Sequence, residues 1–266
     1  MSTEDGPRFR PKRPEDYWSQ EVNPYMLSHR TMGRPVITAE EAQGLRGRWR
    51  DEFGRNAPLH VEVGAGNGFH LAGMAARHPD RNWLGIEIRF KRVVMCAKKI
   101  RKAGVERAAR IVRYDAWSLD DLFAPGEIDA LYVFHPDPWS RRKHSDKRLM
   151  SGRWAGWMCR ALRPGGMVRI KTDHLPHIHG FEEGIEGLPL EIRERRDDVA
   201  VNGYPWPSDD DVITNYESKF HKRNQPVYAI LAERVEGASP PPLPVVDYRP
   251  SEPSGRGASE PEPEAG

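Results

Sequence analysis

The chain has 266 residues, of which 38% are hydrophobic and 30% charged, with a formal net charge of +2. Its two cysteines, Cys96 and Cys159, are too few and too far apart for a disulfide framework or a metal-binding cysteine motif. With no apolar run of the ~18 residues that a membrane span needs and no apolar signal core, we expect a cytoplasmic protein with no membrane association.

Charge is distributed unevenly along the chain. Residues 1–36 are rich in proline and arginine without hydrophobic periodicity, and we expect a mobile basic arm. Residues 236–266 carry six acids, two bases and eight prolines, which predicts a disordered acidic tail. The tail has a net charge of −4, so the rest of the chain carries +6. That excess favours an anionic partner for a folded domain over 37–235.

Helix-like and strand-like segments alternate within this domain. Thr38 and Glu41 form a capping-box motif before a helix expected at 39–53. Further helices are expected at 69–78, 91–104, 147–166 and 175–186. Strands are expected at 59–63, 82–88, 109–115, 128–134, 167–173, 188–196 and 226–234. This order predicts an α/β fold, with a Rossmann-like, seven-stranded, mostly parallel sheet and helices on both faces.

The first expected strand runs into a glycine-rich turn, "EVGAGNGF", which contains Gly64, Gly66 and Gly68. Between a strand and a helix, such a turn lets a ligand approach the backbone closely. The dinucleotide motif would need a third glycine at position 69, where this chain has Phe69. The turn therefore favours a ligand without a pyrophosphate.

Acidic residues occur at the ends of the first three strands. Glu87 is placed to accept hydrogen bonds from ribose hydroxyls, Asp115 to meet an adenine amine, and Glu62 to reach a cationic amino-acid end. A ribose, an adenine and a positive charge together describe S-adenosylmethionine. We therefore expect a class I methyltransferase fold that binds this cofactor; the simpler interpretation is a tight turn beside solvated strand ends.

The run "HPDPWSRRKH" follows the fourth expected strand. Ligands of open α/β sheets bind beyond the carboxyl ends of the strands, which places this run beside the cofactor. Asp137 is the candidate catalytic residue. Trp139 offers a face for base stacking, and Arg141 is one of several cations suited to phosphates. Considered alone, the run could equally be a solvated charged loop.

Together these motifs resemble the bacterial tRNA (guanine-N7-)-methyltransferase family. The matching stretches are "VEVGAGNGF", "GIEI", "HPDPWSRRKHSDKRL", "KTD" and "TNYESKF", between about residues 59 and 220. The resemblance implies methylation of guanine N7 in tRNA, at variable-loop position 46. It implies cofactor contacts from Glu62, Glu87, Asp115 and Asp137. It also implies substrate contacts from Asp173, Thr214, Asn215, Tyr216 and Glu217.

Two positions depart from the family pattern. Arg141 stands where the family has lysine, which keeps the charge but not the geometry. His135 stands where the family has phenylalanine or tyrosine, which changes the packing behind the loop. Thr214 and Glu217 also form a second capping-box motif, so both a helix start and a substrate contact are expected there.

Other functions remain open at this point. His174, His177 and His179 lack the cysteine or acidic partners of a metal site, so we expect no metal. The enzyme could methylate another acceptor, such as an exocyclic amine, a small molecule or a protein. A non-catalytic RNA-binding module is the third alternative. We expect a monomer or a homodimer.

Overall fold

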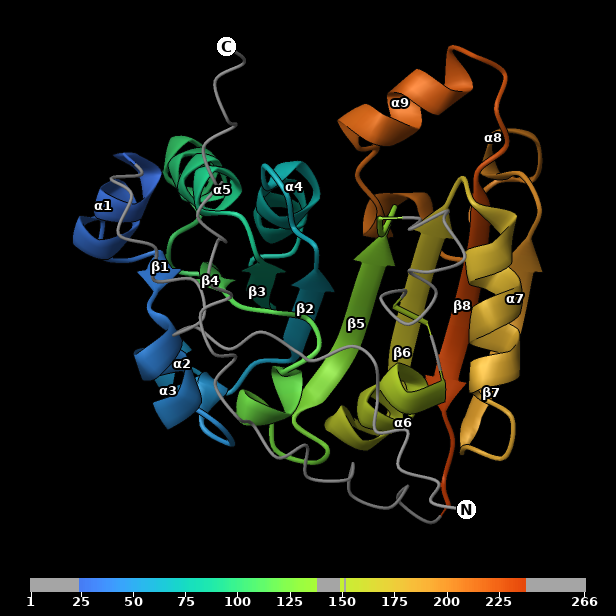
Figure 1. Cartoon of the computed structure of the whole chain (residues 1–266), viewed down its shortest axis with the longest axis horizontal. Helices are drawn as coiled ribbons and strands as arrows, with labels where there is room; N and C mark the ends of the chain where they lie inside the picture. Colours follow the sequence, from blue (N-terminus) through green and yellow to red (C-terminus); the bar gives the residue numbers. More distant parts are fainter. Residues whose placement is uncertain (1–23, 138–148, 151, 238–266) are drawn as a thin grey trace, which may run out of the picture.

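The computed structural model describes residues 24–137, 149–150 and 152–237. These residues form one eight-stranded sheet with helices on both faces (Figure 1). The strands are β1 (Val36–Ile37), β2 (Leu59–Val63), β3 (Asn82–Glu87), β4 (Ala109–Arg113), β5 (Ile128–Phe134), β6 (Leu162–Thr172), β7 (Leu190–Arg196) and β8 (Tyr228–Arg234).

The strand order in the sheet is β1-β4-β3-β2-β5-β6-β8-β7. All pairs from β1 to β6 are parallel, whereas β8 runs antiparallel to both β6 and β7. The expectation of a mostly parallel Rossmann-like sheet is confirmed, but the expected strand number of seven is wrong. The additional strand, β1, has only two residues, too few for a period-2 pattern to identify it from sequence.

Nine α-helices accompany the strands in the described part of the chain. They are α1 (Pro24–Thr31), α2 (Ala39–Gly44), α3 (Trp49–Phe53), α4 (Phe69–Arg77), α5 (Phe90–Lys102), α6 (Gly152–Ala161), α7 (Leu175–Gly184), α8 (Val199–Asn202) and α9 (Asn215–His221). Short 3-10 helices occur at Leu119–Asp121 and Ser208–Asp210. None of the described helices is long and apolar enough to cross a membrane.

Two expected helices have different extents in the structure. The helix expected at 39–53 is divided into α2 and α3, with Gly47 between them in the left-handed region at φ +79°. The helix expected at 147–166 is shorter, because Leu162 already pairs with Ile128 in the sheet. Pro164 has no N–H to donate within a helix, which is consistent with this early end.

The predicted capping box at the start of α2 is confirmed. The Thr38 hydroxyl accepts a hydrogen bond from the Glu41 N–H at 3.2 Å, and the Glu41 carboxylate accepts one from the Thr38 N–H at 2.8 Å. Two donors that would otherwise lack partners at the helix N-terminus are thereby satisfied.

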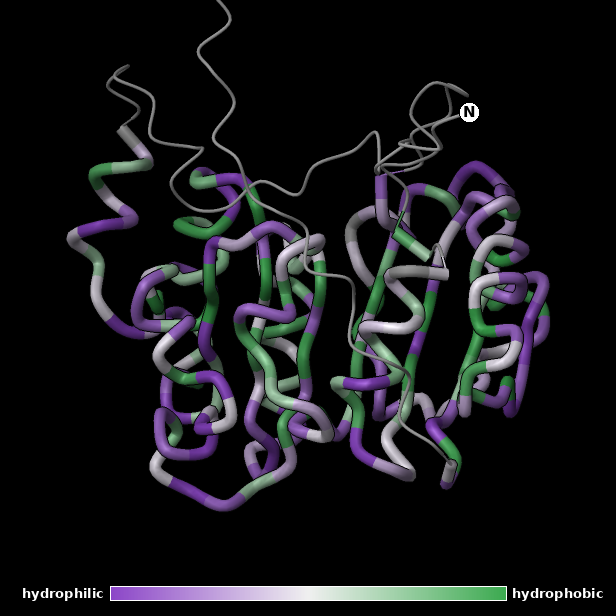
Figure 2. Tube along the Cα trace, turned by 60° about the horizontal axis from the view of Figure 1, so that its bottom comes forward, coloured by the Kyte–Doolittle hydropathy of each residue, from purple (hydrophilic) through white to green (hydrophobic). Residues whose placement is uncertain are grey.

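Two hydrophobic layers enclose the sheet. One packs α2, α3, α6 and α7 against one face, with Trp49, Trp154 and Phe181 among its members. The other packs α4, α5 and the segment around Trp206 against the opposite face. Hydrophobic residues recur along the central strands in Figure 2, as expected for strands buried on both faces.

The described part of the expected N-terminal arm contains the helix α1 and the first residue of β1. The helix α1 packs against α5, where the His29 ring meets the Phe90 ring edge-on at 5.3 Å. Residues 24–31 of the expected arm thus form a helix that packs against α5. Residues 1–23 and the predicted acidic tail from 238 onward lie outside the described residues.

Candidate active site

A pocket of about 560 Å³ lies at the carboxyl ends of β2 to β6, the edge of the sheet where sequence analysis places the ligand. The helix α9 lies beyond the ends of β5 and β6, on the same side (Figure 1). Lining residues are 62–67, 69–70, 86–89, 92, 114–117, 134–137, 149, 173, 214, 216 and 220.

The glycine-rich turn after β2 needs its glycines for two different reasons. Gly64 and Gly66 line the pocket with φ of +82° and +55°, a conformation that other residues rarely adopt. Gly68, at φ +74°, lies outside the pocket lining, and a Cβ added there would lie 2.5 Å from Cys96 Sγ in α5. Gly68 therefore contributes to helix packing, whereas the sequence analysis assigns it to cofactor binding.

Glu87 ends β3 and is held by backbone donors. Its Oε2 accepts a hydrogen bond of 3.0 Å from the Gly66 N–H, and its Oε1 accepts one of 2.9 Å from the Arg89 N–H. The side chain is nearly buried, and this burial raises the pKa of the carboxyl, while the backbone donors and Arg92 partly oppose the rise. The acid has a fixed orientation at the pocket wall.

Glu62 and Asp115, the other two acids at strand ends, also line the pocket. Oδ1 of Asp115 accepts a hydrogen bond from the Trp117 N–H at 3.0 Å, which fixes the turn after β4. Oε2 of Glu62 lies 3.1 Å from Nδ1 of His70 on α4. The three acids of the predicted cofactor site thus surround one cavity.

His135 and Asp173 form a pair on the opposite wall of the pocket. Nδ1 of His135 lies 3.5 Å from Oδ1 of Asp173, and this hydrogen bond lowers the pKa of Asp173. The His135 ring packs beside the rings of Tyr216 and Phe220. In place of the family's phenylalanine or tyrosine, His135 therefore keeps an aromatic contact and adds a polar one.

Asp137, the candidate catalytic residue, lies at the pocket wall with 70% of its side chain exposed. Its Oδ2 is 3.8 Å from the guanidinium of Arg89, which is itself largely exposed. Trp139 and Arg141 lie outside the described residues.

The start of α9 supplies the remaining wall. Thr214 caps the helix by accepting a hydrogen bond from the Glu217 N–H at 3.1 Å, and Tyr216, half exposed, accepts one from Arg92 at 3.2 Å. The Asn215 side chain is not among those that the structure describes. Glu217 is fully buried and does not line the pocket, although the family resemblance implies a substrate contact.

Several polar residues near the site were not identified from the sequence. Lys171 has no exposed surface and pairs with Asp211 and Glu217, and Tyr204 contacts Glu217 as well. The only local signal is a lysine within an otherwise strand-like run, "MVRIKTD". Its partners lie 40 and 46 residues further along the chain, beyond the reach of sequence patterns.

Comparisons with known proteins find related sequences. A family model described as "Putative methyltransferase" matches residues 56–230. A tRNA (guanine-N(7)-)-methyltransferase of Levilactobacillus brevis is 32% identical over 78% of this chain and 92% of that protein. The protein of the same description from Cutibacterium acnes is 34% identical over 76% of this chain and 72% of that protein.

Solved structures show the same fold. The 16S rRNA methyltransferase KamB matches with a TM-score of 0.54 and 15% identity, over 71% of this chain and 94% of that one. The antibiotic-resistance methyltransferase Kmr matches with a TM-score of 0.51 and 16% identity, over 73% of this chain and 94% of that one. The sheet described above is therefore a class I methyltransferase fold, as expected.

Proposed function

Because the chain belongs to the tRNA (guanine-N(7)-)-methyltransferase family, we propose that it transfers a methyl group from S-adenosylmethionine to N7 of a guanine in tRNA, at variable-loop position 46. The observation that carries the proposal is the convergence on one pocket of Glu87 and the glycine turn with Asp173 and Tyr216. The first two suit the cofactor, and the last two suit a purine.

The residues of the cofactor side fit S-adenosylmethionine. Glu87 would accept hydrogen bonds from the ribose hydroxyls, Asp115 from the adenine amine, and Glu62 would face the cationic amino-acid end. Gly66 lines the pocket and has no side chain of its own, so its backbone can be approached closely by a ligand. When bound, the cofactor supplies a methyl group carried on a positively charged sulfur.

The acceptor side would hold guanine without a general base. Guanine N7 has a lone pair and no proton, so the task of the protein is alignment of N7 at attack distance. Asp173, whose lowered pKa keeps it ionised at neutral pH, can accept hydrogen bonds from guanine N1–H and the exocyclic amine. Tyr216 offers a ring for stacking, and Asp137 would stabilise the positive charge that develops on the purine.

A basic helix beside the pocket suits the polyanionic acceptor. The helix α5 carries six cations and no acid: Lys91, Arg92, Lys98, Lys99, Arg101 and Lys102. Among the described lysines, only Lys171 forms ion pairs, so those of α5 have no acidic partner in this part of the chain. By contrast, the arginines of β7 are each paired with an acid. The lysines of α5 are therefore available for RNA phosphates.

We expect a monomer or a homodimer that acts on tRNA in the cytoplasm. Deleting the gene tests the function: bulk tRNA from the deletion strain should lack 7-methylguanosine, and the wild-type gene should restore it. An unchanged 7-methylguanosine content in the deletion strain would contradict the proposal.

A further inference from the structure

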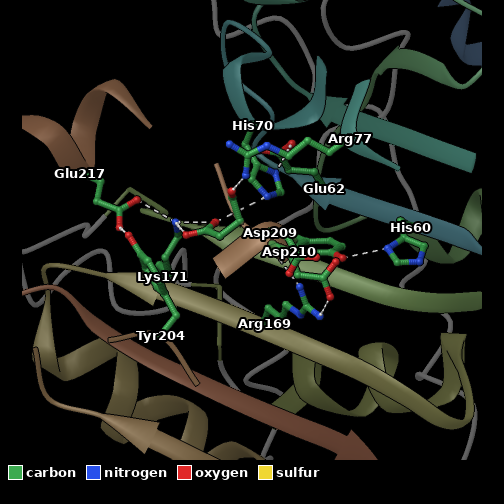
Figure 3. Close-up of polar contacts among 12 residues, drawn as sticks. His60, Glu62, His70, Arg77, Arg169, Lys171, Tyr204, Asp209, Asp210 and Glu217 are labelled. Carbon is green, nitrogen blue, oxygen red and sulfur yellow. Dashed lines mark hydrogen bonds and ion pairs between the residues drawn. The ribbon is translucent and has the colours of Figure 1, made fainter. Parts of the chain in front are cut away.

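A chain of buried polar side chains links the two walls of the pocket (Figure 3). Nζ of Lys171, with no exposed surface, lies 2.7 Å from Oε2 of Glu217 and 2.8 and 2.9 Å from the two carboxylate oxygens of Asp211. The Tyr204 hydroxyl donates a hydrogen bond to Oε1 of Glu217 at 2.5 Å. Both carboxylate oxygens of Glu217 are therefore engaged inside the protein.

The chain continues through His70 to the cofactor wall. Nδ1 of His70 lies 3.1 Å from Oε2 of Glu62, and its Nε2 lies 3.9 Å from Oδ1 of Asp211. The His70 side chain is fully buried among the rings of Trp83, Tyr132 and Phe134. His70 thus lies between Glu62, which lines the cofactor side of the pocket, and Asp211, which pairs with Lys171.

Glu217 and Tyr216 face different directions at the start of α9. Successive helical residues are rotated by roughly 100°, and Tyr216 is half exposed at the pocket whereas Glu217 has no exposed surface. The Glu217 N–H also has a partner, since it donates a hydrogen bond to the Thr214 hydroxyl. Glu217 is therefore fixed at its backbone by Thr214, which lines the pocket, and at both carboxylate oxygens by residues that do not line it.

We propose that Glu217 is a positioning residue, held by Lys171 and Tyr204, which fixes Thr214 and Tyr216 on the pocket wall without itself contacting the acceptor base. Where the base is guanine, this inference rests on the proposed function. It assigns recognition of the exocyclic amine to Asp173, which lines the pocket beside His135.

The choice of variants follows from the buried charges. Removing Lys171 would leave two buried carboxylates without their cation and could prevent folding. Tyr204→Phe removes one hydrogen bond and leaves every charge in place, and Glu217→Gln keeps the size of the side chain. Tyr228→Phe is the matched control, because the Tyr228 hydroxyl forms no hydrogen bond with a described residue.

The test compares tRNA transcripts that carry guanine or inosine at the acceptor position, since inosine lacks the exocyclic amine. For a positioning role, Tyr204→Phe and Glu217→Gln should each lower kcat/KM about tenfold and keep the wild-type preference for guanine. Asp173→Asn should lose that preference. The proposal is overturned if Glu217→Gln loses the preference while Tyr204→Phe retains it, because Glu217 would then contact the amine.

Hydrogen exchange of the free protein gives a second readout that does not depend on the acceptor. Amides of α9 should exchange at least tenfold faster in Tyr204→Phe and Glu217→Gln than in the wild type, and Tyr228→Phe should match the wild type. Unchanged protection of α9 in both variants would overturn the positioning role. Because no tRNA is present, this result stands even if the wild-type protein methylates a different acceptor.

Discussion

Oε2 of Glu87 accepts a hydrogen bond of 3.0 Å from the backbone N–H of Gly66, so the acid that ends β3 is joined directly to the glycine turn that follows β2. A second backbone donor, the Arg89 N–H, contacts Oε1 at 2.9 Å. With both oxygens held by backbone, Glu87 is oriented before a ligand arrives, which lowers the entropic cost of binding.

The first prediction concerns this acid. In Glu87→Gln the amide NH₂ group would face a backbone N–H, and the charge that strengthens a ribose hydrogen bond would be lost. We expect the Kd for S-adenosylmethionine to rise about 10- to 100-fold, from a hydrogen-bond loss of about 1.5–3 kcal/mol. Isothermal titration calorimetry measures this Kd. The exposed Glu186→Gln should bind as the wild type does, and equal Kd values for Glu87→Gln and wild type would contradict the assignment.

The second prediction concerns Asp137. Its side chain is 70% exposed, so Asp137→Ala should leave the melting temperature unchanged. Turnover should fall about 100-fold, the scale reported for removal of one group that stabilises transition-state charge. Single-turnover methylation of tRNA measures this, with Asp80→Ala, another exposed aspartate, as control. Near-normal turnover in Asp137→Ala would contradict a catalytic role for Asp137.

The third prediction separates two glycines that share a left-handed conformation. A Cβ at Gly68 would meet Cys96 Sγ at 2.5 Å, whereas one at Gly104 would meet nothing within 4 Å. Gly104→Ala should cost about 1 kcal/mol of unfolding free energy from strain alone. Gly68→Ala should cost about 3 kcal/mol, because overpacking adds to the strain. Urea unfolding measures both, and equal losses would contradict the packing role of Gly68.

The fourth prediction concerns the basic face of α5. In the double variant Lys98→Gln and Lys102→Gln, two exposed cations that have no acidic partner among the described residues are removed. The KM for tRNA should rise roughly three- to tenfold, and the salt dependence of binding should weaken by about one unit of slope per lost phosphate contact. Arg107→Gln, near the start of β4, should leave both values unchanged. An unaltered salt dependence of binding in the double variant would mean that Lys98 and Lys102 do not contact the RNA phosphates.

The fifth prediction concerns pH. Burial lowers the pKa of His60 to about 3 from an ordinary value of 6.5, so between these values the unfolded chain binds a proton that the folded chain excludes. This contribution to stability is complete above pH 6.5 and declines as the pH falls, by about 1.4 kcal/mol per unit. His60→Gln should have a correspondingly flatter pH dependence between pH 7 and 5. Urea unfolding measures the free energy of unfolding at each pH. The same pH dependence in His60→Gln and in the wild type would contradict the prediction.

Much of the fold could be predicted from the sequence because its signals are local. Strands buried on both faces give continuous apolar runs, and a strand, a glycine turn and a helix in succession indicate the Rossmann-like unit. The two-residue strand β1 had no such signal. The early end of α6 was missed because pairing of Leu162 with Ile128 is a long-range contact.

The site was predictable for residues at strand ends and less so elsewhere. Parallel strands bring Glu62, Glu87 and Asp115 to one edge of the sheet whatever the details of packing, and the structure confirms that all three line one pocket. Burial has no such local signal. Motif similarity therefore did not reveal that Glu217 faces inward toward Lys171, or that Gly68 faces Cys96.

The most direct measurement is methyl transfer by the purified protein from labelled S-adenosylmethionine to unmodified tRNA, followed by digestion to nucleosides. Paired transcripts with guanine or adenine at variable-loop position 46 locate the acceptor. The account predicts that the label appears in 7-methylguanosine with the guanine transcript and is absent with the adenine transcript. Label in any other nucleoside, or equal incorporation into both transcripts, would contradict it.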